Sequence, residues 1–318
     1  MVSFLPLLVR RVTELIVTVF VTSVVIFSTF SFMPGDPAVL LAGGKQQSPE
    51  VIKAIRGQFR LDDPVVVRYF GWLKDLVTGD FGRSYIYRAD VVDLIGPRVE
   101  TTLLLLAYAA IVLLVLGIGG GIAAGLGGKR LDRGITVLAS LSMGAPTFVV
   151  AAALVTVFSL YLGWFPATGA GSGFLDQLRH LTLPALTMSL ASAAFVARLT
   201  RGAVRSELHS EHVDTARSRG IAPRHYIPRD VLRNAAPQIF SVSAITIASL
   251  VAYTAVVESA FGINGIGSLL VSAASRQDLP VVQILSLCMV VIFVVVNTVI
   301  DLVNAALDPR MAVRRAGA

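Results

Sequence analysis

Residues 101–128 read TTLLLLAYAAIVLLVLGIGGGIAAGLGG and contain no Asp, Glu, Lys or Arg. A helix of this length reaches about 42 Å at 1.5 Å per residue, which exceeds the roughly 30 Å of hydrocarbon in a bilayer. Because the stretch is apolar on every face, it suits lipid better than the surface of a soluble domain. It therefore predicts a helix that crosses a membrane, and its glycine-rich part at residues 117–128 indicates close helix packing.

The rest of the chain repeats this pattern, with charge-free stretches at residues 15–32, 134–175, 181–197, 234–257 and 279–300. Charged residues make up only 15% of the 318 residues, against about 25% in an ordinary soluble domain, and the mean hydropathy is +0.75. These figures exclude a disordered chain, and the single cysteine, Cys288, excludes a disulfide scaffold. We predict an all-α polytopic membrane protein with six transmembrane helices, and Pro146 and Pro184 predict kinks within two of them.

The first apolar stretch is interpreted as a retained anchor and not as a signal peptide. Its apolar run is longer than the 7–15 residues usual in a signal peptide. The segment FSFMP at residues 30–34 also offers no small-residue cleavage site.

The distribution of basic residues predicts the orientation. Of the 27 Lys and Arg residues, two precede the first span, three lie between the second and third, eight between the fourth and fifth, and three follow the last. The short loops on the other side hold only Arg179 and Arg276. Cytoplasmic loops carry the excess of Lys and Arg, so both termini are predicted to face the cytoplasm. This accounts for the net charge of +7 without nucleic acid.

We expect three regions along the chain: residues 1–33, with the N-terminus and first span; residues 34–100, outside the membrane; and residues 101–318, with the other five spans and a cytoplasmic loop at 201–237. The outer region predicts short amphipathic helices that begin near Ser48-Pro49 and Asp63-Pro64. The second of these helices is expected to have one apolar face, formed by Val66, Phe70, Leu73 and Val77. These helices either lie on the membrane interface or offer a docking surface to an external partner.

The cytoplasmic loop predicts a short, well-delimited helix. Ser210 is suited to its N-cap and Gly220 to a left-handed turn at its end, which leaves about nine residues, or roughly 13 Å. Val213 and Ala216 share one face, with the small Thr215 beside them. Such a helix suits close approach by another protein, and a helix lying on lipid headgroups is the alternative.

Taken in order, the motifs of the chain resemble those of permease subunits of dipeptide/oligopeptide (peptide/nickel-type) ABC transporters. In the cytoplasmic loop, Asp214-Thr215-Ala216-x-x-x-Gly220 is similar to the EAA motif of that family. The other matching segments are Pro34-Gly35-Asp36-Pro37, Pro146-Thr147-Phe148, Gly163-Trp164-Phe165-Pro166-Ala167-x-Gly169, Leu183-Pro184-Ala185, Arg198-Leu199-Thr200-Arg201, Leu232-Arg233-Asn234-Ala235, Glu258-x-x-Phe261-Gly262 with Gly265 and Gly267, Asp278-x-Pro280, and Asp308-Pro309-Arg310.

The resemblance covers nearly the whole chain. It is closest to the first-permease type, which has a long periplasmic loop after its first helix. The sequence departs from the family's pattern at two points of the cytoplasmic loop. Asp214 and Thr215 stand where the EAA motif has Glu and Ala. Ala236-Pro237 stands where the loop usually closes with Leu-Pro, and its spacing from Gly220 is one residue shorter.

The resemblance implies a type I ABC importer permease fold that forms half of a translocation pathway. The implied partners are a second, different permease subunit, two cytoplasmic ATP-binding subunits, an extracytoplasmic substrate-binding protein and the bilayer. ATP and Mg would be bound by the partner subunits, so this chain is expected to hold no cofactor and to be no enzyme. The residues implied to couple it to an ATPase are Glu211, Asp214, Thr215, Ala216 and Gly220.

A second candidate site lies between the fifth and sixth predicted spans. Glu258, Phe261 and Gly265 are candidates for a gate at the outer entrance, where Glu258 is expected to face outward. A structural hydrogen-bonding role for Glu258 is the alternative.

Other classes of function find less support in the sequence. No Ser-His-Asp order, phosphate loop or zinc-ligand spacing is visible, so no catalytic or metal-binding residue is predicted. An ion-coupled secondary transporter, the alternative class, predicts charges near mid-span, which the six stretches lack. Peptides are the expected substrate, and nickel chelates, glutathione and haem remain alternatives because the external binding protein largely sets specificity in this family.

Overall fold

The computed structural model describes residues 4–31, 38–39, 48–58, 61–84 and 86–307. These residues form helices and turns, with one isolated β-bridge between Arg83 and Asp90. Two of the family motifs, at residues 34–37 and 308–310, lie outside the described residues. The same holds for Arg314 and Arg315, which follow the second motif. The all-α prediction is confirmed.

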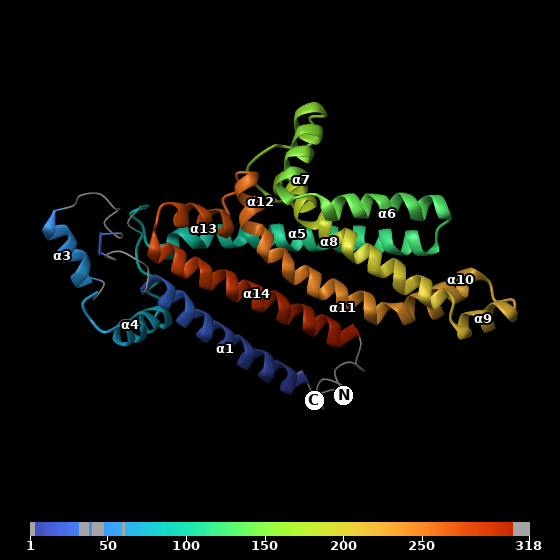
Figure 1. Cartoon of the computed structure of the whole chain (residues 1–318), viewed down its shortest axis with the longest axis horizontal. Helices are drawn as coiled ribbons and strands as arrows, with labels where there is room; N and C mark the ends of the chain where they lie inside the picture. Colours follow the sequence, from blue (N-terminus) through green and yellow to red (C-terminus); the bar gives the residue numbers. More distant parts are fainter. Residues whose placement is uncertain (1–3, 32–37, 40–47, 59–60, 85, 308–318) are drawn as a thin grey trace. The chain divides into compact units, whose positions relative to one another are not determined.

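Five helical segments are long and apolar enough to cross a membrane, and a bent pair supplies the sixth. The five are Val9–Thr29 within α1 (Phe4–Ser31), α5 (Val91–Leu126), α8 (Phe174–Leu208), the run Pro223–Ala260, and Leu279–Leu302 within α14 (Leu279–Leu307). The run Pro223–Ala260 comprises α10 (Pro223–Tyr226), η2 (Ile227–Leu232), α11 (Arg233–Ser249), η3 (Leu250–Tyr253) and α12 (Thr254–Ala260). The predicted six-span arrangement is confirmed (Figure 1).

The third span is broken, as Pro146 predicted. Helix α6 (Lys129–Gly144) meets the pair α7 (Thr147–Leu154) and η1 (Val155–Tyr161) at 114°. Ala145 has φ −85° and ψ 128°, because a proline disfavours helical geometry at the residue before it. Pro184, by contrast, lies inside the continuous helix α8.

The chain divides into two compact units. The first unit holds Leu103–Ile263 and Val296–Ala318 with Met1–Val2, and the second holds Ser3–Thr102 and Asn264–Val295. Within the first unit, α8 packs along α6 and α11 (Figure 1).

Three glycines of α5 form a seam with α8 in the first unit. Gly117, Gly121 and Gly125 recur every fourth residue and lie against Val196, Thr200 and Val204, which recur in the same register. A Cβ atom placed on Gly117 would lie 2.9 Å from Cβ of Val196, so only glycine permits this approach. This small-residue pattern is a typical device for packing helices within membranes, and it confirms the close packing that the glycine-rich stretch predicts.

The second unit is built around aromatic and aliphatic contacts. Besides α1 it contains α3 (Pro49–Gln58), α4 (Val65–Val77) and α13 (Ile266–Ser275), and both outer helices begin where the sequence predicts. The hydroxyls of Ser23 on α1 and Tyr69 on α4 lie 2.9 Å apart, and the Tyr69 and Phe27 rings meet edge to face.

Val66, Phe70, Leu73 and Val77 share one face of α4, as predicted, but this is not the face that packs within the chain. Val66, Phe70 and Val77 are exposed, whereas Tyr69 is buried and Trp72 is partly buried. The aromatic contacts of Tyr69 with α1 bury the opposite face, and these contacts connect residues 46 positions apart.

A turn of the second unit is fastened to the junction of α13 and α14. Ser84 donates a hydrogen bond to Oδ2 of Asp278, and the Arg276 guanidinium lies 5.6 Å from the centre of the Tyr87 ring. Asp278 is 3% exposed. Because burial disfavours the carboxylate, the pKa of Asp278 is raised despite the hydrogen bond from Ser84.

Candidate functional site

The predicted short helix of the loop is α9 (Glu211–Ser218), with eight residues and a length of about 12 Å. It ends at Gly220, whose φ of +69° lies in the left-handed region. The Gly220 N–H donates to the carbonyl of Arg217 at 2.9 Å, and the Ile221 N–H donates to that of Ala216 at 3.1 Å. The glycine turn expected at this end is therefore confirmed.

The start of α9 differs in detail from the prediction. Ser210 occupies the N-cap position, with φ −82° and ψ 151°, but its side chain makes no hydrogen bond to the helix amides. Its hydroxyl donates instead to the carbonyl of Glu207 at 2.5 Å. The end of α8 lies only two residues before Ser210, so the hydroxyl satisfies a carbonyl of that helix.

One face of α9 packs on the chain itself. Val213 is fully buried and Ala216 is 6% exposed. They belong to a cluster with residues from α8, α10, η2 and α11, namely Ala203, Val204, Tyr226, Val231, Ala235 and Ile239. This cluster holds α9 against the ends of the long helices, so a force applied to α9 reaches them through packed side chains.

The other face of α9 is open to solvent in this chain. Glu211, Asp214, Thr215 and Gly220 are exposed, and the hydroxyl of Thr215 donates to the carbonyl of Glu211 at 2.9 Å. Of the five residues predicted to meet an ATPase, four therefore lie on the accessible face. Ala216 lies on the other face, against the chain's own cluster.

His212 ties α9 to the following helices and was not recognised from the sequence. Its Nε2 lies 3.2 Å from Oγ of Ser210, from the carbonyl of Asp230 and from Nδ2 of Asn234. Glu207 Oε2 lies 3.5 Å away. One imidazole nitrogen thus meets groups from α8, the α8–α9 connection, η2 and α11. In the sequence, the only indication of the contact between His212 and Asn234 was that Asn234 belongs to one of the motifs shared with the family.

Arg217 makes a second connection from α9. Its guanidinium lies 5.7 Å from the centre of the Tyr226 ring on α10, and its NH1 lies 3.4 Å from Asp214 Oδ1. The ring contact is a cation–π interaction, which adds to the hydrophobic cluster beneath it.

The end of α8 that leads into α9 is fixed to α6 by charged groups. Asp132, in the first turn of α6, accepts hydrogen bonds from both Arg201 and Arg205, the latter at 2.8 Å. The hydrogen bond from Arg201 and the positive charges of both arginines lower the pKa of Asp132 to about 2. One turn before Arg201, Arg198 donates to Oγ of Ser140 at 2.9 Å. We call Asp132, Arg201 and Arg205 the α6–α8 fork.

The candidate gate residues are packed inside the chain, with Glu258 fully buried and Phe261 1% exposed, and their role at an entrance stays a prediction. The loop before α8 explains the burial, since the Gly169 N–H donates to the Phe261 carbonyl at 2.9 Å and closes the loop over the end of α12. Gly265 belongs to the second unit, where it precedes α13 and its N–H donates to Oγ of Ser268 at 3.1 Å.

Long apolar helices joined by a loop that carries a short exposed helix define a multi-pass membrane protein of the transport class. A model of binding-protein-dependent transport system inner membrane components matches residues 117–313, and a model of the N-terminal part of such membrane components matches residues 1–106. The chain belongs to this family.

Relatives and solved structures agree with this assignment. The chain is 34% identical over 310 residues to a protein of Brucella abortus (strain 2308) named as a peptide transport system permease, covering 96% of this chain and 98% of the relative. It is 33% identical over 302 residues to the glutathione transport system permease GsiC of Escherichia coli (strain K12), covering 95% and 97%. A chain of the inward-facing MetNI methionine ABC transporter is similar in fold, with a TM-score of 0.54 and 17% identity over 68% of this chain and 96% of that chain. The type I ABC importer permease fold is thereby confirmed.

Proposed function

We propose that the chain is the transmembrane permease subunit of an ATP-driven importer of short peptides. It would form half of the translocation pathway beside a second permease subunit, in the inner membrane with both termini in the cytoplasm. Two cytoplasmic ATP-binding subunits would hold ATP and Mg, and an external binding protein would deliver the substrate. The substrates named for the two relatives support peptides, with glutathione, itself a tripeptide, within the same class.

The observation that carries the proposal is the two-sided character of α9. Val213 and Ala216 fasten the helix to α8 and α11, whereas Glu211, Asp214 and Thr215 are exposed on the outward side. A helix held in this way transmits a push from an attached ATPase to the spanning helices as a rigid-body movement. Ala216 then acts as an anchor to its own chain, and the exposed residues with Gly220 form the contact surface.

The test places a bulky residue on the exposed face. Thr215→Trp removes a single hydroxyl contact, with the Glu211 carbonyl, and fills the space that an ATPase would occupy. Thr13→Trp is the matched control, because Thr13 is exposed on α1 and its hydroxyl donates to a carbonyl four residues earlier at 2.9 Å in the same way. Both variants are co-expressed with the neighbouring transport subunits and reconstituted into vesicles, and peptide uptake and ATP hydrolysis are measured.

We expect Thr215→Trp to be inserted and folded but to lose most peptide uptake and its control over ATP hydrolysis, and Thr13→Trp to retain both. Normal uptake by Thr215→Trp would contradict the coupling role of α9. Uptake of labelled dipeptides and glutathione, compared with a nickel chelate and haem, tests the substrate class separately. Uptake of only the last two would contradict the peptide assignment and leave the coupling role intact.

A further inference from the structure

One side of α4 presents a row of large apolar side chains at its surface. The row is formed by Val66, Phe70, Leu73 and Val77, and we call it the free face of α4. Val66, Phe70 and Val77 are 65%, 59% and 80% exposed. A contiguous apolar surface of this kind marks a place where a protein meets a membrane or another protein. The contacts of α4 with α1 decide between the two.

Helix α1 gives the height of α4 in the membrane. Its apolar segment Val9–Thr29 rises about 30 Å, which is the thickness of the hydrocarbon layer. Ser23 lies six residues before the end of this segment, and therefore about 9 Å inside the hydrocarbon. The hydroxyl of Tyr69 on α4 lies 2.9 Å from that of Ser23, and the ring centres of Tyr69 and Phe20 lie 6.4 Å apart. The side chain of Tyr69 thus reaches from α4 into the hydrocarbon layer.

Other contacts place the body of α4 at the border of this layer. Phe27 lies two residues before Thr29, about 3 Å inside the hydrocarbon. The Arg68 guanidinium lies 5.9 Å from the centre of the Phe27 ring, and the Trp72 ring centre lies 5.6 Å from it. Arginine and tryptophan side chains typically reach the level of the lipid headgroups. Helix α4 therefore lies at headgroup level beside the end of α1 (Figure 1), and Tyr69 points deeper.

The free face points in nearly the same direction as Tyr69. Tyr69 and Leu73 are four residues apart, so their side chains leave the helix within about 40° of each other. Asp75 follows Leu73 by two residues and leaves the helix about 160° away from it, and it is exposed. With Tyr69 directed into the hydrocarbon, the free face meets acyl chains and Asp75 meets water.

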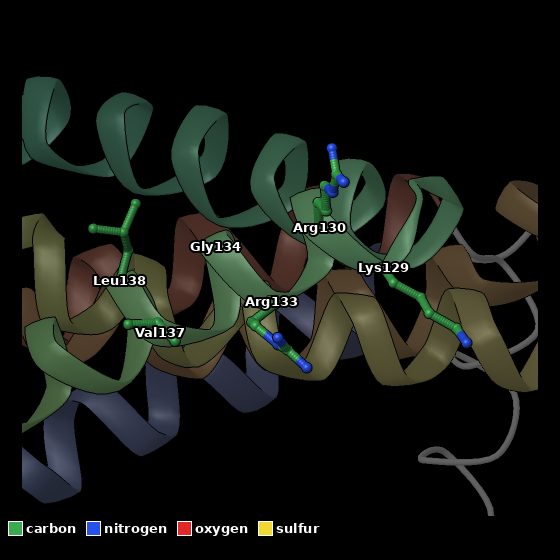
Figure 2. A pocket seen from close by; sticks show the side chains of 6 residues that line it. All are labelled: Lys129, Arg130, Arg133, Gly134, Val137 and Leu138. Carbon is green, nitrogen blue, oxygen red and sulfur yellow. The ribbon is translucent and has the colours of Figure 1, made fainter.

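Helix α6 shows the different pattern of a helix that enters the membrane along its axis. Figure 2 shows the basic side chains of its first turns, with Arg130 pointing away from Lys129 and Arg133, and the apolar side chains of Val137 and Leu138 farther along. In α6 the charged residues point in different directions, and the apolar residues follow them along the helix. In α4 the charged and apolar residues lie on opposite sides of the same turns, which is typical of a helix in the plane of the interface.

We propose that α4 lies in the membrane interface on the side opposite the N-terminus of α1, with its free face against lipid acyl chains. Interfacial helices bury their apolar face about 5–10 Å into the boundary of headgroups and acyl chains, and the reach of Tyr69 agrees with this depth. Phe20, which contacts Tyr69, is 48% exposed, so the apolar surface of α1 continues into that of α4. The inference requires that α1 spans a membrane, and it does not depend on the transport function or the substrate.

Fluorescence quenching in lipid nanodiscs tests the proposal on the full-length chain with the subunits that copurify. In a Cys288→Ser background, Phe70→Cys introduces one site on the free face for a bimane label. Asp75→Cys is the matched control, because Asp75 is exposed on the other side of the same helix. Val77→Cys provides a second site on the free face should Phe70→Cys fail to fold. Quenching is measured with iodide in the buffer and with a phospholipid that carries a nitroxide near the top of its acyl chain.

We expect the label of Phe70→Cys to be quenched by the nitroxide lipid and to lose most of its quenching by iodide, because the free face lies among acyl chains. The label of Asp75→Cys is expected to show the reverse. Val77→Cys is expected to behave as Phe70→Cys does, since both residues belong to the free face.

Two results would overturn the proposal. Equal iodide quenching of Phe70→Cys and Asp75→Cys would show that the free face lies in water, where it is open to an external protein. Protection of Phe70→Cys and Val77→Cys from both quenchers would show that another protein subunit covers the free face instead of lipid.

Discussion

Gly121→Ala tests the helix seam on which the first unit depends. The new Cβ would lie 2.6 Å from the Ala197 carbonyl oxygen and closer still to Cβ of Thr200, where two carbon atoms normally stay at least 3.5 Å apart. Neither neighbour is the flexible end of a long side chain, so α5 and α8 must move apart by about 1 Å. That separation also opens the contacts of Gly117 and Gly125 along the same seam.

Overpacking of this kind costs about 1–3 kcal/mol, and the upper end applies because backbone is involved. Alanine recovers up to about 1 kcal/mol in helix propensity. The expected net loss for Gly121→Ala is therefore about 2 kcal/mol. Gly119→Ala is the matched control, since nothing lies within 4 Å of its Cβ position and only the propensity gain applies.

The free energy of unfolding of the full-length chain is measured for both variants in mixed micelles by titration with a denaturing detergent. We expect Gly121→Ala to unfold at a clearly lower detergent fraction than the unaltered chain, and Gly119→Ala at an equal or higher one. Equal stability of the two variants would refute the close contact of α5 with α8. Gly125→Ala is expected to fall between them, because the nearest atom there is a methyl group of Val204, at 2.8 Å.

The other predictions concern charge and turn geometry. Asp132→Asn is expected to lower thermal stability more than Asp62→Asn, because the Asp62–Arg56 pair is exposed. Since the folded pKa of Asp132 is about 2, the fork contributes above pH 3.8 and is lost as pH falls toward 2, which an acid titration of thermal stability checks. Asp278 has the opposite sign: its raised pKa means that stability falls as pH rises through the folded pKa, and Asp278→Asn is expected to remove that slope. For Gly220, with φ +69° and open space around it, Gly220→Asn is expected to retain peptide uptake and Gly220→Val to reduce it, because asparagine tolerates the left-handed region and a β-branched residue does not.

Local features were the ones that the sequence could predict. The lengths of the apolar stretches predict the six spans, Pro146 predicts the bend between α6 and α7, and Gly220 predicts where α9 ends. Each of these depends on residues that lie within one continuous segment of the chain. The glycine spacing in α5 predicted close packing, although it did not identify α8 as the partner.

Features that depend on distant residues were missed. The buried face of α4 follows from Tyr69 meeting Ser23 and Phe27 on α1, and no periodicity within α4 carries that information. Ser84 and Asp278 are 194 positions apart, so the sequence gave no reason to pair them. The burial of Glu258 was not predicted, because charged residues near helix ends usually reach water, and the Gly169 loop that covers Phe261 was not foreseeable from α12 alone.

The contacts of α8 explain how the chain could move α9 and the spans together. Val196, Thr200 and Val204 face the glycines of α5, whereas Arg201 and Arg205 hold Asp132 of α6. Two sides of the same helix are thus fixed within the last four turns of α8. A packed helix transmits a displacement only where its neighbours move with it. We therefore expect a displacement of α9 to pass through the cluster beneath it to α8, and from α8 through the seam to α5 and through the fork to α6. If the proposed function holds, Gly121→Ala and Asp132→Asn should each reduce peptide uptake per ATP hydrolysed even where the subunits still bind, and unchanged uptake per ATP in both would show that α9 acts through α11 instead.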